Sequence, residues 1–264
     1  MNMNMENFWP AFCMVCLAGL ATGIGGLISF LSKHTSARFL ALSLGFSAGV
    51  MIYVSFMEIM PSSEASFLAA GHGDAAVARM TAGFFLGMAL IAVIDMLVPK
   101  FQNPHEVHSG GVCDKNLQRL GMFSAVAIAV HNFPEGLATF SIALQEPRLG
   151  MVIALAIAIH NIPEGIAVGA PIYCSTGSRK KAFLWSLLSG LSEPLGALIG
   201  FFFLRVFFTN GVLGWILSGV AGIMVYISLD ELLPTAEAYG EHHLCMIGLT
   251  AGMAVMAGSL LLLG

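Results

Sequence analysis

The stretch Ala-Val-His-Asn-Phe-Pro-Glu-Gly-Leu-Ala at residues 129–138 occurs again as Ala-Ile-His-Asn-Ile-Pro-Glu-Gly-Ile-Ala at residues 158–167. The two copies are 29 residues apart, and both lie inside long apolar runs. A single histidine in an apolar run is usually an ordinary core residue. Duplication of the whole His-Asn-x-Pro-Glu-Gly pattern instead favours two helices that carry matching ligands.

The side chains of each copy suit a divalent cation of intermediate hardness. In a helix, His131 and Glu135 share one face because they are four residues apart, and His160 and Glu164 repeat that spacing. The proline in each copy lacks an N–H group, so a nearby backbone carbonyl loses its usual partner and becomes a further oxygen ligand. The candidate ligands of the two copies are His131, Asn132, Glu135, His160, Asn161 and Glu164.

The composition around these copies is that of an integral membrane protein. The 264 residues are 57% hydrophobic and 10% charged, with a mean hydropathy of +0.85, whereas soluble domains carry about 25% charged residues. The net charge of −4 and the isoelectric point near 6.0 give no reason to expect a nucleic-acid partner. We therefore expect the chain to reside in the lipid bilayer.

Apolar runs long enough to cross a bilayer recur along the whole sequence. We predict an all-α fold in which residues 1–264 form a single transmembrane domain of eight helices. The predicted spans are 8–31, 38–60, 78–98, 119–144, 148–173, 182–205, 212–234 and 243–263. Eight of the 11 Lys and Arg residues lie in or at the odd-numbered loops. Those loops are therefore predicted to face the cytosol, with both termini on the outer, periplasmic or extracellular, side.

A second level of repetition relates the first three spans to the last three. The matching ranges are 48–61 with 221–234, 19–30 with 190–201, and 83–92 with 248–257. Together with the duplicated motif, they predict that spans 1–3 correspond to spans 6–8 and span 4 to span 5. Corresponding spans are an odd number apart and cross the membrane in opposite directions. This 3 + 2 + 3 inverted repeat is typical of secondary transporters with a site near the midplane.

Three carboxylates, Glu135, Glu164 and Glu193, lie deep inside the predicted spans. An ionised carboxylate at the centre of a membrane helix costs about 2.5–3.5 kcal/mol on insertion scales, and no Lys or Arg lies deep in any span to compensate it. The carboxylates are therefore either protonated or paired with a cation, and the nearby histidines favour the cation. Glu193 corresponds to Thr22 in the repeat, so it adds a third carboxylate that breaks the symmetry.

The two His-Asn-x-Pro-Glu-Gly copies resemble the signature of the ZIP (Zrt/Irt-like) family of divalent metal transporters, in particular its bacterial ZupT-type branch. The similarity extends to SLGFSAGVM at 43–51, Ser192-Glu193, and SLDELLP at 228–234, and so covers essentially the whole chain. It implies metal uptake across the cell (inner) membrane into the cytosol, a homodimer, a sliding motion, and no prosthetic group. It also implies Zn²⁺ as the usual cargo, with Fe²⁺, Mn²⁺, Co²⁺ and Cd²⁺ often accepted. The implied two-metal site has the ligands His131, Asn132, Glu135, His160, Asn161, Glu164 and Glu193.

Two other functions fit parts of this pattern. A passive zinc-selective channel of the same fold is hardly separable from a carrier by sequence. An intramembrane zinc-dependent hydrolase would also use histidine and glutamate, but no His-Glu-x-x-His motif occurs and the two copies are equal instead of divided into ligand and base. We therefore expect a transporter and not an enzyme.

Overall fold

The computed structural model describes residues 5–29, 37–97, 115–204, 209–238 and 241–263, and these residues form helices and short connections without a strand. The α-helices are α1 (Phe8–Ile28), α2 (Ala37–Val54), α3 (Met60–Ala69), α4 (Ala76–Leu97), α5 (Lys115–Gln145), α6 (Pro147–Thr176), α7 (Arg179–Gly190), α8 (Ser192–Ile199), α9 (Asn210–Ile227), α10 (Leu233–Ala238) and α11 (His242–Leu263). Short 3₁₀-helices occupy Met5–Asn7 and Gly73–Ala75.

Seven helical segments of the described chain are long and apolar enough to cross a membrane. They are Phe8–Ile28, Ala37–Ala69, Gly73–Ile94, Pro147–Thr176, Arg179–Phe202, Asn210–Glu237 and His242–Leu262. The helix α5 coincides with the predicted fourth span but is not one of the seven. The fold is thus that of an all-α, multi-pass membrane protein.

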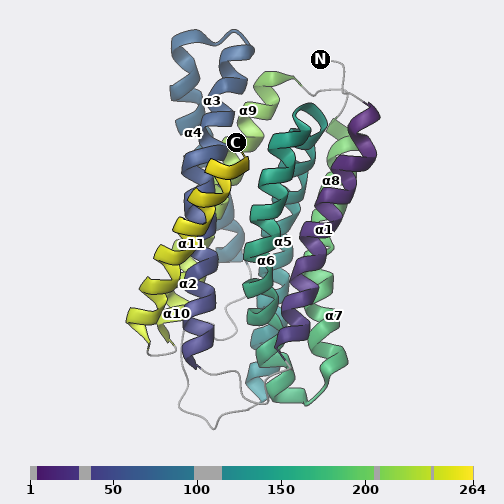
Figure 1. Cartoon of the computed structure of the whole chain (residues 1–264), viewed down its shortest axis with the longest axis vertical. Coiled ribbons are helices and arrows are strands. Elements are labelled where there is room, and N and C mark those ends of the chain that lie inside the picture. The colour runs from purple at the N-terminus through teal and green to yellow at the C-terminus, as the bar shows by residue number, and fades with distance from the viewer. Residues whose placement is uncertain (1–4, 30–36, 98–114, 205–208, 239–240, 264) are drawn as a thin grey trace.

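The helices form two groups that stand side by side (Figure 1). In one group, α1 packs along α6 and α7, and α5 packs along α6 and α8. In the other group, α2 packs along α11, and α9 packs along α3 and α4. The contacts of α2 with α6 and of α5 with α9 join the two groups. The duplicated motif lies on α5 and α6, in the interior of the molecule.

Two long segments pass through a proline without ending. A π-helical turn, Ser55–Ile59, precedes Pro61 between α2 and α3, and another, Ser228–Leu232, precedes Pro234 between α9 and α10. A proline ring clashes with the carbonyl four residues before it, and the wider π turn gives that ring room. The predicted span ends at residues 60 and 234 therefore fall inside longer helical segments.

Glycines bring the paired helices into backbone contact. A Cβ atom on Gly25 would collide with the carbonyl oxygen of Ile162, and one on Gly165 would collide with that of Thr22, so α1 and α6 touch without side chains between them. Four further pairs of helices in the described part of the chain meet in the same way. The contacts are Gly136–Glu193 and Gly196–Phe133 between α5 and α8, Gly49–Leu249 and Gly252–Phe46 between α2 and α11, Gly222–Phe84 and Gly87–Gly219 between α4 and α9, and Gly19–Gly190 between α1 and α7. Such close approach is typical of membrane helix pairs.

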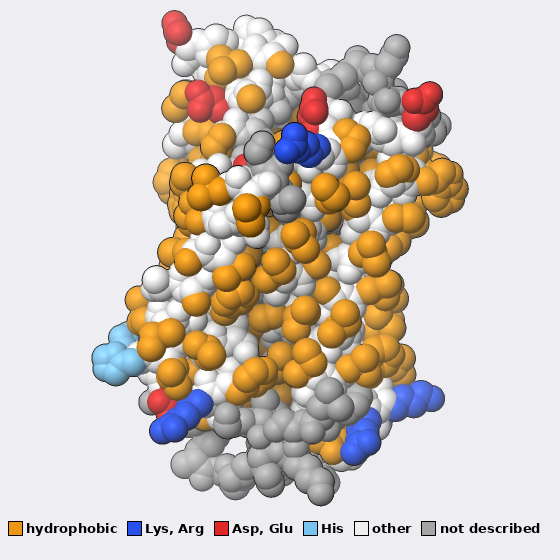
Figure 2. Space-filling view, in the orientation of Figure 1, with side chains coloured by type: hydrophobic (Ala, Val, Ile, Leu, Met, Phe, Trp, Pro, Cys, Tyr) orange, Lys and Arg blue, Asp and Glu red, His pale blue; other side chains and the backbone are white. Residues whose placement is uncertain are grey.

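The surface agrees with a membrane location. Apolar side chains cover the middle of the visible face (Figure 2). Most of the visible carboxylates gather at one end of the molecule and most of the visible Lys and Arg side chains at the other. The helices α4 and α11 leave most of their side chains outside the core, as expected for helices that face lipid.

Candidate metal centre

The centre of the molecule contains polar side chains from α5, α6 and α8 that are withdrawn from solvent. Proline occurs inside both α5 and α6, at Pro134 and Pro163, yet each helix continues through it. Glu193 lies in the first turn of α8, directly after the break at Leu191 that separates α7 from α8. The predicted ligands that are buried to 1% exposure or less are Asn132, Glu135, His160, Asn161, Glu164 and Glu193.

A side-chain contact joins the two motif copies. His160 Nε2 of α6 lies 3.4 Å from Glu135 Oε2 of α5, and both side chains are fully buried. Spacing along the helix places His160 on the same face as Glu164, and the structure also brings it to the carboxylate of the other copy. A histidine and a carboxylate from two helices at one buried position are suitable ligands for a single divalent ion.

Asn161 connects the second copy to two other helices. Its Nδ2 atom donates to the carbonyl oxygen of Ala18 on α1 at 2.9 Å and to Glu193 Oε1 on α8 at 2.5 Å. Both protons of the amide are therefore engaged. Its Oδ1 atom, the amide atom with lone pairs to offer a cation, has no hydrogen-bond partner among the described residues.

Several other polar atoms of this cluster have no hydrogen-bond partner within the described part of the chain. They are Asn132 Oδ1 and Nδ2, Glu135 Oε1, and Glu193 Oε2. A buried polar group left without a partner costs about 1–3 kcal/mol, so native proteins rarely contain several together. Most of these atoms are oxygens, which fits a site whose partner is a cation.

The remaining predicted ligands are less defined. The side chain of His131 lies outside the described residues, so its place relative to Glu135 is not part of this description. Glu164 is fully buried on α6. No group of three or more His, Cys, Asp or Glu side chains among the described residues already has the geometry of a metal site.

Three neighbouring groups were not predicted from the sequence. The Ala18 carbonyl accepts from Asn161, and the Ser47 hydroxyl of α2 donates to the backbone carbonyl of His160 at 3.3 Å. Thr139 of α5 is buried, and its hydroxyl has no partner among the described residues. Its spacing of four residues from Glu135 is the signal in the sequence that places it on the same helix face.

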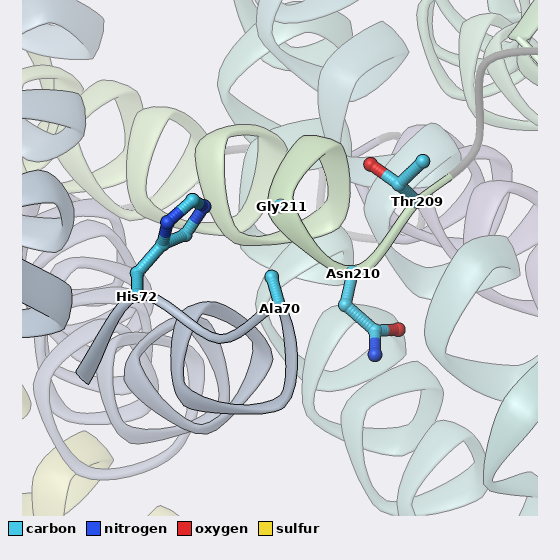
Figure 3. Close-up of a pocket in the computed structure, with 5 residues that line it drawn as sticks. All are labelled: Ala70, His72, Thr209, Asn210 and Gly211. Atoms are coloured by element: carbon cyan, nitrogen blue, oxygen red, sulfur yellow. The ribbon is translucent and has the colours of Figure 1, made fainter.

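A separate cavity of about 380 Å³ lies at one end of the molecule and contains none of the predicted ligands. It is lined by Ala70 and His72 from the α3–α4 turn and by residues 209–211 at the start of α9 (Figure 3). The ring of His72 is held by Arg79, whose Nη1 atom lies 3.2 Å from His72 Nε2. The buried cluster around Glu135 and Glu193 thus remains the candidate metal centre.

Carboxylate, imidazole and amide groups buried between the helices of a multi-pass membrane protein are typical of the class of membrane transporters. Comparison with known proteins gives the family. Residues 98–260 match the family model described as ZIP zinc transporter. The chain is 57% identical to "Zinc transporter ZupT" of Chlorobium phaeovibrioides, with 98% of this chain and 100% of that protein covered.

Relatives from other bacterial groups give the same result. Proteins named "Zinc transporter ZupT" from Nitratidesulfovibrio vulgaris and Streptococcus mutans are 56% and 54% identical, each over 97% of this chain and 98% of the relative. The chain therefore belongs to the ZIP zinc transporter family. Members of this family are membrane transporters and not enzymes, which excludes the hydrolase considered from the sequence.

Proposed function

We propose that this protein takes up zinc, and with it iron(II), manganese, cobalt and cadmium, across the cell inner membrane into the cytosol. The observation that carries the proposal is the buried cluster in which Glu135 meets His160 and Asn161 meets Glu193. Full-length relatives named as zinc transporters support zinc as the main cargo. The proposed ligands are His131, Asn132, Glu135, His160, Asn161, Glu164 and Glu193.

In this mechanism, a hydrated cation exchanges part of its water shell for histidine and glutamate at the centre of the membrane. The carboxylates neutralise its charge, and the asparagine oxygens complete the shell. The presence of three carboxylates and two amides supports the two-ion site that the family resemblance implies. Such ligands bind firmly enough to remove water but weakly enough to release the ion. They do not select one metal by affinity, so geometry and metal supply set the preference.

We propose a carrier and not a passive channel. Glu135, His160, Glu164 and Glu193 are each at most 1% exposed. An ion can reach such side chains only after helices move, whereas an open channel would leave them in contact with water. The division of the helices into two groups supports a sliding movement of one group against the other.

We also propose that the 264 residues form one domain of eight spans in the 3 + 2 + 3 inverted arrangement, with α5 as the fourth. The glycine contacts support it. Adding 171 to Gly25 and subtracting 29 from Ile162 turns the Gly25–Ile162 contact into the Gly196–Phe133 contact. The π turn at Ser55–Ile59 likewise corresponds to that at Ser228–Leu232, an offset of 173.

The proposed orientation places the basic end of the molecule in the cytosol and both termini outside. A fluorescent protein fused to the C-terminus should then stay dark, because it does not mature after export in an unfolded state. Bright fluorescence would show the opposite orientation.

We propose that the transporter is a homodimer, with the exposed apolar helices supplying the contact. Light scattering of the purified protein in detergent would measure its mass, and a monomer would refute the dimer.

The decisive experiment is uptake of radioactive zinc into liposomes that contain the purified protein, with Fe²⁺, Mn²⁺ and Cd²⁺ as competitors. We expect saturable uptake that is lost in Glu164→Ala while this variant still inserts. Flux that rises in proportion to the gradient without saturation would favour the channel. Normal uptake by Glu164→Ala would refute the central site, and no uptake by a folded wild-type protein would refute the function as stated.

A further inference from the structure

Three polar residues of α5 lie on one face of that helix. Glu135 follows Asn132 by three residues, and Thr139 follows Glu135 by four, so the three side chains form a continuous row. Each is at most 1% exposed. Each also carries at least one polar atom that has no hydrogen-bond partner within the described part of the chain. Thr139 lies one helical turn beyond Glu135, toward the end of the molecule where α5 connects to α6.

The hydroxyl of Thr139, like that of Thr22 on α1, differs from several other helical hydroxyls of this protein because it has no hydrogen-bond partner among the described residues. Ser141, two residues further along α5, donates to the carbonyl oxygen of Leu137 at 2.6 Å. Ser55 and Ser228 donate in the same way to the carbonyl four residues before them. Such a bond to the preceding turn is the usual way to satisfy a buried hydroxyl in a helix. Thr139 does not make it, although the carbonyl of Glu135 is available at the same spacing.

We propose that the Thr139 hydroxyl is a further binding group for the transported cation, next to Glu135 on the path into the carboxylate cluster. The proposal deepens, and rests on, the proposed transport function. A hydroxyl oxygen is a neutral ligand, so it can hold a cation briefly without adding to the negative charge of the site. The corresponding residue of the second motif copy, 29 positions later, is Val168, which is fully buried and apolar. The hydroxyl therefore belongs to one copy only.

Because Val168 occupies the corresponding position of the α6 copy, a branched apolar side chain is expected to fit at position 139 as well. Thr139→Val is consequently a mild substitution that removes the hydroxyl and keeps the shape. Thr139→Ser keeps the hydroxyl and removes the methyl group. Ser141→Ala is the matched control, because it removes an equally buried hydroxyl of the same helix that already has a protein partner.

Two measurements on the purified protein test the proposal. The first is the midpoint of thermal unfolding in detergent without zinc and with a series of zinc concentrations. The second is the KM and maximal rate of zinc uptake into liposomes. For Thr139→Val we expect a zinc-free midpoint no lower than that of the wild type, a smaller rise of the midpoint with zinc, and a KM raised roughly threefold to tenfold, the size of one lost neutral ligand. Thr139→Ser and Ser141→Ala should keep the wild-type KM.

The proposal is overturned if Thr139→Val unfolds at a lower temperature but binds and transports zinc normally, because its hydroxyl then has a structural partner. A KM raised equally in Thr139→Val and Thr139→Ser would show that the exact shape of the side chain, and not the hydroxyl, sets the KM, and would also overturn the proposal. Should the valine variant fail to accumulate, Thr139→Ala replaces it in both measurements. Absence of uptake by the wild type would refute the transport function alone, since the zinc-dependent midpoint still reports binding by Thr139.

Discussion

The two copies of the His-Asn-x-Pro-Glu-Gly pattern have nearly the same sequence but different surroundings. In the α6 copy, Asn161 donates to Ala18 and Glu193, and Ser47 donates to the carbonyl of His160. In the α5 copy, Asn132 has no hydrogen-bond partner among the described residues. The comparison shows that two copies of one motif can have different roles, one in holding the helices together and one in binding the ion. We interpret the α6 copy as fixed by the protein and the α5 copy as open to the ion.

The largest expected effect tests whether both copies are needed. Glu135→Ala and Glu164→Ala should each reduce zinc uptake into liposomes to background, because each removes a charged ligand that the other copy cannot replace. The double variant should be no worse than either single variant, since the ligands act as one unit. Full uptake by Glu135→Ala would refute the need for both copies, because the α6 copy would then be sufficient for zinc transport.

The next prediction concerns a property in which the two copies should be alike. Gly136→Ala and Gly165→Ala both place a methyl group against backbone atoms, those of Glu193 and Thr22, which cannot turn aside. Each should destabilise the protein by about 2–3 kcal/mol, the range for overpacking. Thermal unfolding in detergent measures this.

Gly258→Ala is the control for these glycines, because nothing lies within 4 Å of the added atom. It should be neutral or slightly stabilising, since alanine is the better helix former. A loss of stability in only one of Gly136→Ala and Gly165→Ala would extend the difference between the copies from their polar side chains to their packing.

The third prediction separates the two asparagines. Asn161→Ala removes two buried hydrogen bonds between helices and should cost about 2 kcal/mol, at the upper end of values in membrane proteins. Asn132→Ala should leave zinc-free stability unchanged and instead weaken zinc binding. Thermal unfolding with and without zinc distinguishes the two. Equal stability losses would show that the α5 copy is held by protein contacts as well.

The smallest effect is expected at the contact between the two helix groups. Ser47→Ala removes one hydrogen bond to the α6 copy and should cost about 0.6 kcal/mol, the average for such a bond between membrane helices. The same unfolding assay measures it, with Ser66→Ala, a partly buried hydroxyl that bonds only to its own helix, as the control. A larger loss in Ser66→Ala would deny Ser47 a role in joining the groups.

Much of this architecture could be predicted from the sequence because it depends on repetition and composition. The 29-residue spacing identified α5 and α6 as related helices, and the apolar runs located the membrane segments. The two π turns could not be predicted, because one extra residue per turn leaves no trace in composition, and Pro61 and Pro234 instead indicated helix ends. A proline marks a turn that is altered but does not tell whether the helix goes on beyond it.

The site was predictable as a set of ligands but not as a set of contacts. Spacing within a helix places His160 beside Glu164. It cannot show that Asn161 contacts Ala18 and Glu193, because these two residues lie on other helices. Which side chains meet depends on how α1, α6 and α8 cross, and the glycine contacts decide that crossing. The Thr139 hydroxyl does not stand out in the composition because threonine is common in membrane helices, and its spacing from Glu135 together with its missing partner distinguishes it.

The glycine contacts also have a consequence for how the protein is made. Gly49 of α2 packs against Leu249 of α11, a residue synthesised 200 positions later. At about 5–20 residues per second, the ribosome needs on the order of 10–40 s to deliver that partner. During this interval the glycine face of α2 meets lipid or a foreign helix. A helix that is synthesised much later therefore completes a contact that α2 has left open. A chain that ends before α11 would expose a surface suited to unwanted association in the membrane.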